Sequence, residues 1–332
     1  MLTRGERDEG RDERKKHKRA LCSLIPYLTA SVGKQRSRTG LTSLRSCNAL
    51  ILPIQWSFPC SGIESYRGRN FIMPENRVVE LTVSKGVGVI TINNPPVNAL
   101  TLEVRGQLKE TLNEVEKNTE IRVLVITGAG PKCFVAGADI KDFPNQFKEG
   151  PRENATIYKE MFSYLENTPR PVICALNGLA LGGGLELALA CDIRIADEKA
   201  KLGLTEVLLG LLPGLGGTQR LARLVGPAKA KELLFSGKIV KADEALRIGL
   251  VNEVVPAGES LNEALILAEK LAKGAGIAMG YDKQLINKGM ELSLADALEM
   301  EMHYVEKVFE TEDLREGLDA FINKREAVFK NR

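Results

Sequence analysis

Apolar and polar residues follow one another along the middle of the chain in two alternating patterns. Short apolar runs typical of strands lie at residues 78–83, 87–92, 123–127, 172–176 and 193–196. Apolar positions three and four residues apart, the period of an amphipathic helix, lie at residues 100–117, 155–166 and 185–190. Strands that alternate with helices predict an α/β body in which helices pack against a sheet.

Beyond Gly214 the strand pattern nearly disappears and helical patterns follow one another. They cover residues 228–235, 242–247, 261–273, 292–309 and 311–329. The last of these keeps large apolar side chains such as Leu318 and Phe321, so we expect it to dock on the body or on a neighbouring subunit. The pattern as a whole predicts an α/β core over residues 73–265 and a helical C-terminal region over residues 266–332.

The 332 residues carry a net charge of +3, which is unevenly distributed. Residues 1–72 contain 14 basic and 6 acidic residues, a net charge of +8, whereas residues 73–332 carry a net charge of −5. The first 72 residues show no hydrophobic period, and a strand pattern follows Met73 at once. We expect a disordered extension or a mis-set start there. The basic, serine-rich part also resembles a transit peptide, and such a stretch can serve as a tail for nucleic acid or a membrane surface.

Composition argues against several classes of protein. Mean hydropathy is −0.11, and no apolar run approaches the roughly 18 residues that a membrane span needs. The six cysteines show no CxxC spacing and there are only two histidines. We therefore expect neither a transmembrane protein, nor a disulfide scaffold, nor a metal site.

Two glycine-rich loops, at residues 182–184 and 213–217, are the first candidates for chemistry. Neither matches the GxGxxG of a dinucleotide-binding fold, because Leu187 and Gln219 stand where the third glycine is required. The GxxxxGK[ST] pattern of a P-loop does not occur either. The first loop lies between an expected strand and an expected helix. Its glycines let the backbone approach a ligand, and the free N–H groups at the helix start favour an oxyanion.

Small residues at 135–140 offer a second backbone donor. If the N–H groups of Ala138 and Gly183 converge, they hold a developing enolate oxygen, and loss of one such donor typically lowers the rate about 100- to 1000-fold. Two carboxyls accompany them. Glu186 lies in the first turn of the helix after the first loop, and Glu206 lies in an apolar segment, where burial raises the pKa of a carboxyl. Two such carboxyls suit the movement of a proton and a water next to a carbonyl.

Each of these features alone also has a purely structural explanation. Glu186 could interact with the helix dipole, Glu206 could be a surface residue at a strand end, and the three glycines could form only a tight turn. Their joint occurrence is what favours a catalytic site.

Four motifs in order resemble the crotonase (enoyl-CoA hydratase/isomerase) superfamily. They are AGADIK at residues 136–141, NGLALGGGLELA at 177–188, GLTEVLLG at 203–210 and PGLGGTQRL at 213–221. The resemblance covers the chain from about residue 78 to residue 332. It implies a spiral of ββα units, and a helical C-terminal region that forms trimers and covers the active site. It also implies a homotrimer or a dimer of trimers.

The resemblance further implies a coenzyme A thioester whose carbonyl oxygen lies between the N–H groups of Ala138 and Gly183. Because both acid positions are glutamate, it implies a 2-enoyl-CoA hydratase that makes 3-hydroxyacyl-CoA. Glu186 would deprotonate the water that attacks C3, and Glu206 would deliver a proton to C2. How strictly the two glutamates divide these roles stays open. No cofactor is expected, since coenzyme A is part of the substrate.

The resemblance indicates the residues that contact the coenzyme less clearly than it indicates the two glutamates. By resemblance these contacts are expected at Asn98, Ala99, Lys132, Ala136, Lys141, Phe321 and Lys324. The two lysines Lys132 and Lys141 would face the nucleotide phosphates, although each could equally be a solvated surface charge. Phe321 and Lys324 would reach the coenzyme of an adjacent subunit. Many relatives have a basic residue just before the Asn-Ala-Leu turn, where this chain has Val97.

Two alternatives remain. An enoyl-CoA isomerase would shuttle the proton with Glu206 alone. A nucleic-acid-binding protein would use the basic tail, but the acidic body and the lack of an aromatic stacking pattern argue against it. We expect an acyl-CoA substrate, no nucleic-acid or membrane partner, and a cytoplasmic location, or the mitochondrial matrix if residues 1–72 are a transit peptide. The acyl chain length and the pathway, with fatty-acid β-oxidation among the candidates, stay open.

Overall fold

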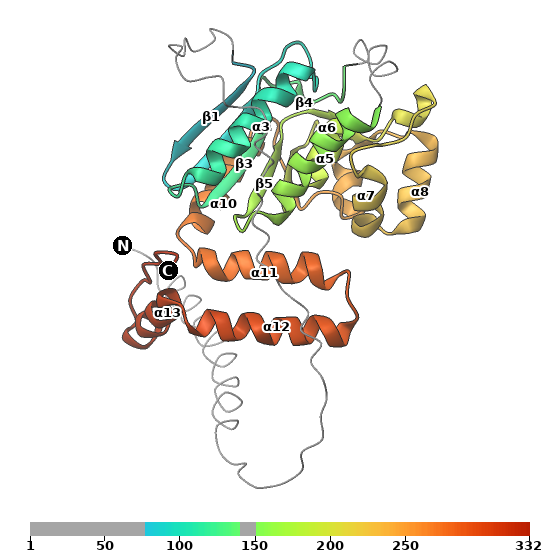
Figure 1. The fold of residues 1–332 in the computed structure, drawn as a ribbon. Helices are drawn as coiled ribbons and strands as arrows, with labels where there is room; N and C mark the ends of the chain where they lie inside the picture. The colour runs from blue at the N-terminus through green and yellow to red at the C-terminus, as the bar shows by residue number, and fades with distance from the viewer. Residues whose placement is uncertain (1–76, 140–150) are drawn as a thin grey trace, which may run out of the picture. The chain divides into compact units, whose positions relative to one another are not determined.

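The computed structural model of the chain describes residues 77–139 and 151–332 (Figure 1). The basic segment 1–72, with its expected roles in targeting or nucleic-acid binding, lies outside the described residues, and so does Lys141. The described residues all belong to one compact unit.

Within the described residues the strands form a six-stranded and a four-stranded sheet. The larger sheet has the order β1-β2-β3-β5-β7-β10, in which β1 and β2 are antiparallel and the other neighbours are parallel. Its strands are β1 (Val79–Ser84), β2 (Val87–Ile92), β3 (Val123–Gly128), β5 (Val172–Leu176), β7 (Ile193–Asp197) and β10 (Glu253–Val255). The smaller sheet consists of β4 (Cys133–Val135), β6 (Leu179–Leu181), β8 (Lys201–Gly203) and β9 (Val240–Lys241), in that order.

Helices connect these strands and then continue alone to the C-terminus. They are α3 (Leu102–Lys117), α5 (Pro151–Asn167), α6 (Gly183–Leu189), the 3-10 helix η2 (Glu206–Leu209), α7 (Gly217–Val225), α8 (Pro227–Ser236), α9 (Ala242–Arg247), α10 (Ser260–Ala272), α11 (Gly276–Gly289), α12 (Leu294–Phe309) and α13 (Glu312–Asn323). The expected α/β body followed by helices is therefore present. Among the described residues, no helix is long and apolar enough to cross a membrane.

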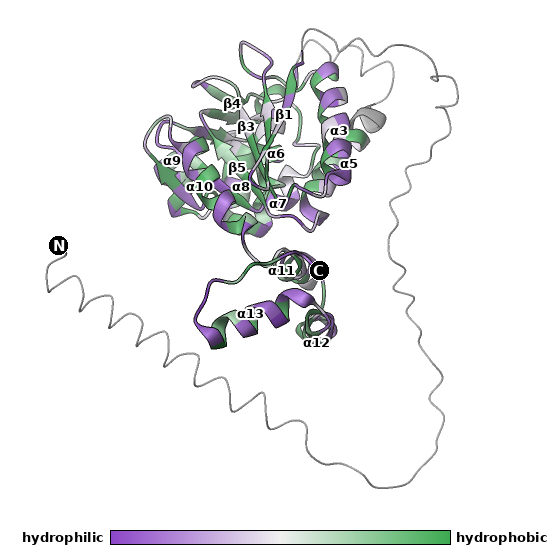
Figure 2. Ribbon diagram, turned by 90° about the vertical axis from the view of Figure 1, so that its left-hand side faces the viewer, coloured by the Kyte–Doolittle hydropathy of each residue, from purple (hydrophilic) through white to green (hydrophobic). Residues whose placement is uncertain are grey.

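The central strands of the large sheet are buried on both faces, and their successive residues enter different cores. In β3, Leu124 and Ile126 belong to the core that includes α3 and α5, whereas Val123 and Val125 pack with alanines of α10. This explains the uninterrupted apolar runs of the sequence, since strands covered on both sides have no solvent face. In Figure 2 the central strands are hydrophobic, and α3 carries hydrophilic residues.

Several elements differ from those expected. The short strands β4, β6, β8, β9 and β10 were not predicted, because two or three residues are too few to show a period. Helix α11 was also missed, since glycines such as Gly280 interrupt its pattern. The expected helix at 311–329 ends at Asn323, where Lys324 takes a left-handed conformation with a φ of 55°. The expected boundary at residue 265 falls inside α10, which packs on the large sheet.

Candidate active site

Three of the expected site residues follow neighbouring strands of the small sheet. Ala138 comes three residues after β4, Gly183 two residues after β6, and Glu206 three residues after β8. These strands are adjacent and parallel. Because the carboxyl ends of parallel strands meet at one edge, the sheet brings the three residues together there.

The two expected backbone donors lie side by side. Leu100 N donates to Gly137 O at 2.8 Å, and Leu100 forms a parallel bridge with Ala138, so the N–H of Ala138 points away from Leu100. Gly183 is the first residue of α6, and its N–H has no carbonyl within the helix to bind. A Cβ placed on Gly183 would stand 3.9 Å from Ala138 N. Both N–H groups thus come from the same small region, at a helix N-terminus that favours negative charge.

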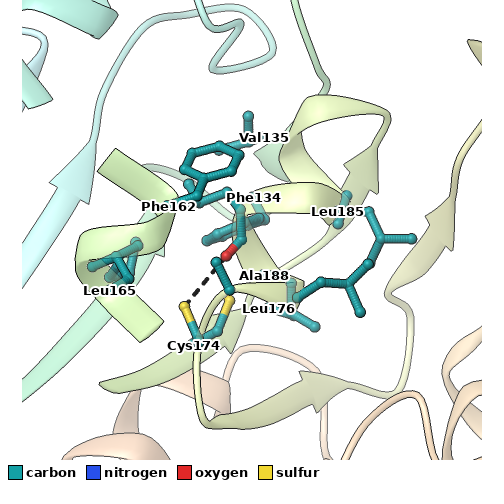
Figure 3. Packing of buried hydrophobic residues seen from close by; sticks show 14 of the residues in the cluster. Phe134, Val135, Phe162, Leu165, Cys174, Leu176, Leu185 and Ala188 are labelled. Atoms are coloured by element: carbon teal, nitrogen blue, oxygen red, sulfur yellow. Dashed lines mark hydrogen bonds between the residues drawn. The ribbon is translucent and has the colours of Figure 1, made fainter. Parts of the chain in front are cut away.

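Close packing of α6 on β4 fixes this arrangement. A Cβ on Gly184 would overlap the carbonyl group of Val135, so only glycine lets the helix approach the strand this closely. Directly beneath, Val135, Leu185 and Ala188 pack in the main hydrophobic core together with Phe134 (Figure 3). The segments that carry the N–H groups of Ala138 and Gly183 therefore pack directly against the hydrophobic core.

Glu186 is buried, with only 2% of its surface exposed. Its Oε1 accepts hydrogen bonds from Leu215 N and Gly217 N, both at 2.8 Å. Burial raises the pKa of Glu186 from an ordinary 4.5 to about 7, and the two backbone hydrogen bonds oppose the rise. The charge of Glu206 raises this pKa further, while that of Arg220 lowers it. Glu186 is thus placed to exchange a proton near neutral pH.

Glu206 begins η2 and faces the glycine turn before α6. Its Oε1 lies 3.1 Å from the point where a Cβ of Gly182 would stand. Its Oε2 is buried and finds no hydrogen-bond partner among the described residues. Burial raises the pKa of this carboxyl, and its own backbone N–H opposes the rise. A buried, unpaired carboxyl oxygen favours the protonated form, which can donate.

The described part of the chain contains no group of three His, Cys, Asp or Glu that could hold a metal ion. What the edge of the small sheet does hold is two carboxyls and a pair of N–H groups.

A sequence model for the family described as Enoyl-CoA hydratase/isomerase matches residues 82–332. The chain belongs to this family, within the crotonase superfamily.

Named relatives in this family share much of the sequence. The chain is 45% identical over 248 residues to the "Short-chain-enoyl-CoA hydratase" of Clostridium acetobutylicum, covering 74% of this chain and 95% of the relative. It is 42% identical over 256 residues to the "Crotonyl-CoA hydratase" of Syntrophomonas wolfei, covering 77% and 98%. The crystal structure of an enoyl-CoA hydratase from Bacillus anthracis superposes with a TM-score of 0.75 at 40% identity, covering 77% of this chain and 100% of the other. The α/β family fold is therefore shared.

Residues expected to contact the coenzyme fall into two groups. Asn98 is buried, and its Nδ2 donates to Ala129 O and Cys133 O at 3.1 and 2.9 Å, so its side chain holds the backbone next to the donors. Ala99 O accepts from Asn94 Nδ2 at 2.8 Å, and Ala136 N donates to Val97 O at 3.1 Å. The segment before α3 is thereby tied to the segment after β3. Any contact that Asn98 makes with a coenzyme must come from its backbone.

The remaining expected contacts lie on exposed positions. Lys132 is exposed in the turn before β4, and Phe321 and Lys324 are exposed on α13 and at its C-terminal end. Within the described residues, no hydrogen bond or ion pair joins any of these three side chains to the glutamates. Their part in coenzyme binding stays a prediction.

Three hydrogen-bonding groups of the site were not predicted from the sequence. These are the N–H groups of Leu215 and Gly217, which bind Glu186, and the guanidinium of Arg220. The loop at 213–217 was singled out for its glycines, and that was the available signal. Arg220 gave none, because its partner Glu166 lies 54 residues away in the sequence.

Proposed function

We propose that the protein is an enoyl-CoA hydratase that adds water across the C2=C3 bond of a trans-2-enoyl-CoA. The observation that carries this proposal is the placement of two carboxyls, Glu186 and Glu206, around one pair of backbone N–H groups. The relatives named as hydratases support it. The thioester carbonyl would bind between the N–H groups of Ala138 and Gly183, which stabilise the enolate oxygen.

In this proposal the two carboxyls have different roles, which their surroundings support. Burial raises the pKa of Glu186 to about 7 and its two N–H donors oppose the rise, which supports a role as the base toward water near neutral pH. Among the residues that the structure describes, no donor binds the buried Oε2 of Glu206, and burial raises the pKa of this carboxyl, which supports a role as the acid toward C2. Water loses one proton to Glu186 and its oxygen bonds to C3, while Glu206 gives its proton to C2. Transfer of a proton from Glu186 to Glu206, directly or through solvent, restores the starting state.

Finer features belong to the same proposal. The strand pairs β3–β4, β5–β6 and β7–β8 each place one strand in either sheet, which supports a spiral of ββα units. The C-terminal helices expose large apolar side chains, among them Leu294, Met302, Phe309 and Ile322, which supports assembly into a trimer or a dimer of trimers. We also propose that the reaction needs no cofactor. We place the protein in the cytoplasm, or in the mitochondrial matrix if residues 1–72 are a transit peptide.

Hydration of crotonyl-CoA, followed as loss of enoyl absorbance, tests the proposal. The intact protein should be active, and Glu186→Gln and Glu206→Gln should each lower kcat about 100- to 10,000-fold. Both variants should keep the thermal unfolding transition of a folded protein. An inactive wild-type protein, or glutamine variants with unchanged rates, would refute the assignment. Isomerisation of a 3-enoyl-CoA that survives in Glu186→Gln would point to an isomerase instead.

A further inference from the structure

The loop that binds Glu186 is itself held by a side chain outside the site. Both backbone polar groups of Leu215 are hydrogen-bonded: its N–H donates to Glu186 Oε1, and its carbonyl accepts from Arg220 Nη1 at 2.6 Å. Gly217, at the start of α7, donates the second hydrogen bond to the same carboxyl oxygen. Arg220 stands one turn further along α7 and therefore reaches back over the loop.

Glu166, near the end of α5, orients this guanidinium. Its Oε1 and Oε2 accept from Arg220 Nε and Nη2 at 2.5 and 2.7 Å, which makes the pair bidentate. The ion pair is half-buried, with 15% of the Arg220 side chain and 33% of the Glu166 side chain exposed. Arg220 Nε and Nη2 donate to Glu166, and Nη1 donates to the Leu215 carbonyl. The planar guanidinium has one orientation that satisfies all three hydrogen bonds.

Gly216 is shaped to let Arg220 reach the loop. Its φ is 103°, a conformation that side chains with a Cβ rarely adopt. A Cβ at this position would also collide with the guanidinium of Arg220. Loop and arginine therefore fit together only with glycine at 216.

We propose that Arg220, oriented by Glu166, is a positioning residue for the base Glu186: by binding the Leu215 carbonyl it fixes the loop whose N–H groups bind the carboxylate. This inference rests on the proposed hydratase function. Burial is the largest influence on the pKa of Glu186 and raises it. Four neighbouring groups act as well: the N–H groups of Gly217 and Leu215 and the charge of Arg220 on α7 favour the ionised form, and the charge of Glu206 on η2 opposes it. Removal of the arginine takes away a favourable charge and at the same time releases the carbonyl of Leu215, which accepts from it.

The test compares Arg220→Met, Arg220→Lys and Glu166→Gln with the control Arg223→Met, using kcat and KM for crotonyl-CoA hydration as a function of pH. Arg223 lies on the same helix and is exposed, and Gln219 is its one hydrogen-bond partner within residues 77–139 and 151–332. We expect Arg220→Met to lower kcat about 10- to 100-fold at neutral pH with little change in KM, because a displaced catalytic group loses rate on this scale. The acid limb of the kcat profile should move to higher pH.

The lysine and glutamine variants separate geometry from charge. Arg220→Lys keeps the charge without the fork, so the acid limb should return toward its wild-type position while kcat stays reduced. Glu166→Gln keeps Arg220 but removes the bidentate ion pair that orients it. It should therefore lower kcat even if Arg220→Met does not fold, with circular dichroism as the check on folding. Loss of kcat without a shifted limb in Arg220→Met, or losses no larger than in Arg223→Met, would overturn the inference. An inactive wild-type protein would instead refute the hydratase assignment itself.

Discussion

Replacement of Glu186 by glutamine should stabilise the protein, and more so the higher the pH. The pKa of this carboxyl is 4.5 in its ordinary state and about 7 in the folded protein. Between these values the folded chain holds more protons than the unfolded chain, so stability falls as the pH rises through the window and levels off above about 7. At 1.36 kcal/mol per pKa unit, ionising the buried group lowers the free energy of unfolding by about 3 kcal/mol.

Glutamine at position 186 removes this pH-dependent loss of stability, because it stays neutral. Its side-chain oxygen can still accept from Leu215 N and Gly217 N. Urea unfolding followed by circular dichroism, at equal protein concentration, should show little difference between the variant and the wild-type protein at pH 4.5. At pH 8 the variant should be more stable by about 3 kcal/mol. Glu206, whose pKa is also raised, titrates in both proteins and largely cancels. A stability difference that does not grow with pH would refute the claim that burial, rather than local hydrogen bonding, dominates the ionisation of Glu186.

Three further substitutions test the backbone of the site. Gly183→Pro removes the N–H at the first position of α6, whereas the control Gly183→Ala adds a Cβ but keeps this donor. The proline variant should have a kcat about 100- to 1000-fold below that of the alanine variant. Equal rates would exclude this N–H from the oxyanion site. Gly184→Ala should destabilise the fold by about 1–3 kcal/mol, because the new Cβ collides with the Val135 carbonyl. The control Gly106→Ala, at an exposed position of α3 with open space around it, should stabilise the fold slightly. Thermal unfolding measures both changes. Asn98→Ala leaves the Cys133 carbonyl short of a buried donor and should destabilise by about 2 kcal/mol, while exposed Asn262→Ala should change stability by less than about 0.5 kcal/mol.

The sequence was informative wherever the pattern was long or chemically unusual. Strands such as β3 and β5 show as continuous apolar runs because both of their faces are covered. Glu206 stood out as a carboxyl in an apolar segment, and it is partly buried, with one oxygen that no group in the described part of the chain binds.

What the sequence did not reveal depends on short elements and distant pairs. The strands that align Ala138, Gly183 and Glu206 have three residues each, too few for any periodicity. Glu186 could be proposed as a carboxyl but not as a buried one, because its burial arises from the loop at 213–217 folding over it. The pairing of Arg220 with Glu166 depends on how α7 meets α5, which local patterns do not encode.

The small sheet delivers its three contributions on separate strands, and this makes the chemistry modular. One N–H donor follows β4 and the other follows β6, whereas Glu206 follows β8. If the site works as proposed, a change confined to the few residues after β8 would replace one reactive carboxyl and leave the two backbone donors in place. For redesign, residues 204–206 are therefore the economical place to begin, and the glycines at 182–184 the place to leave untouched.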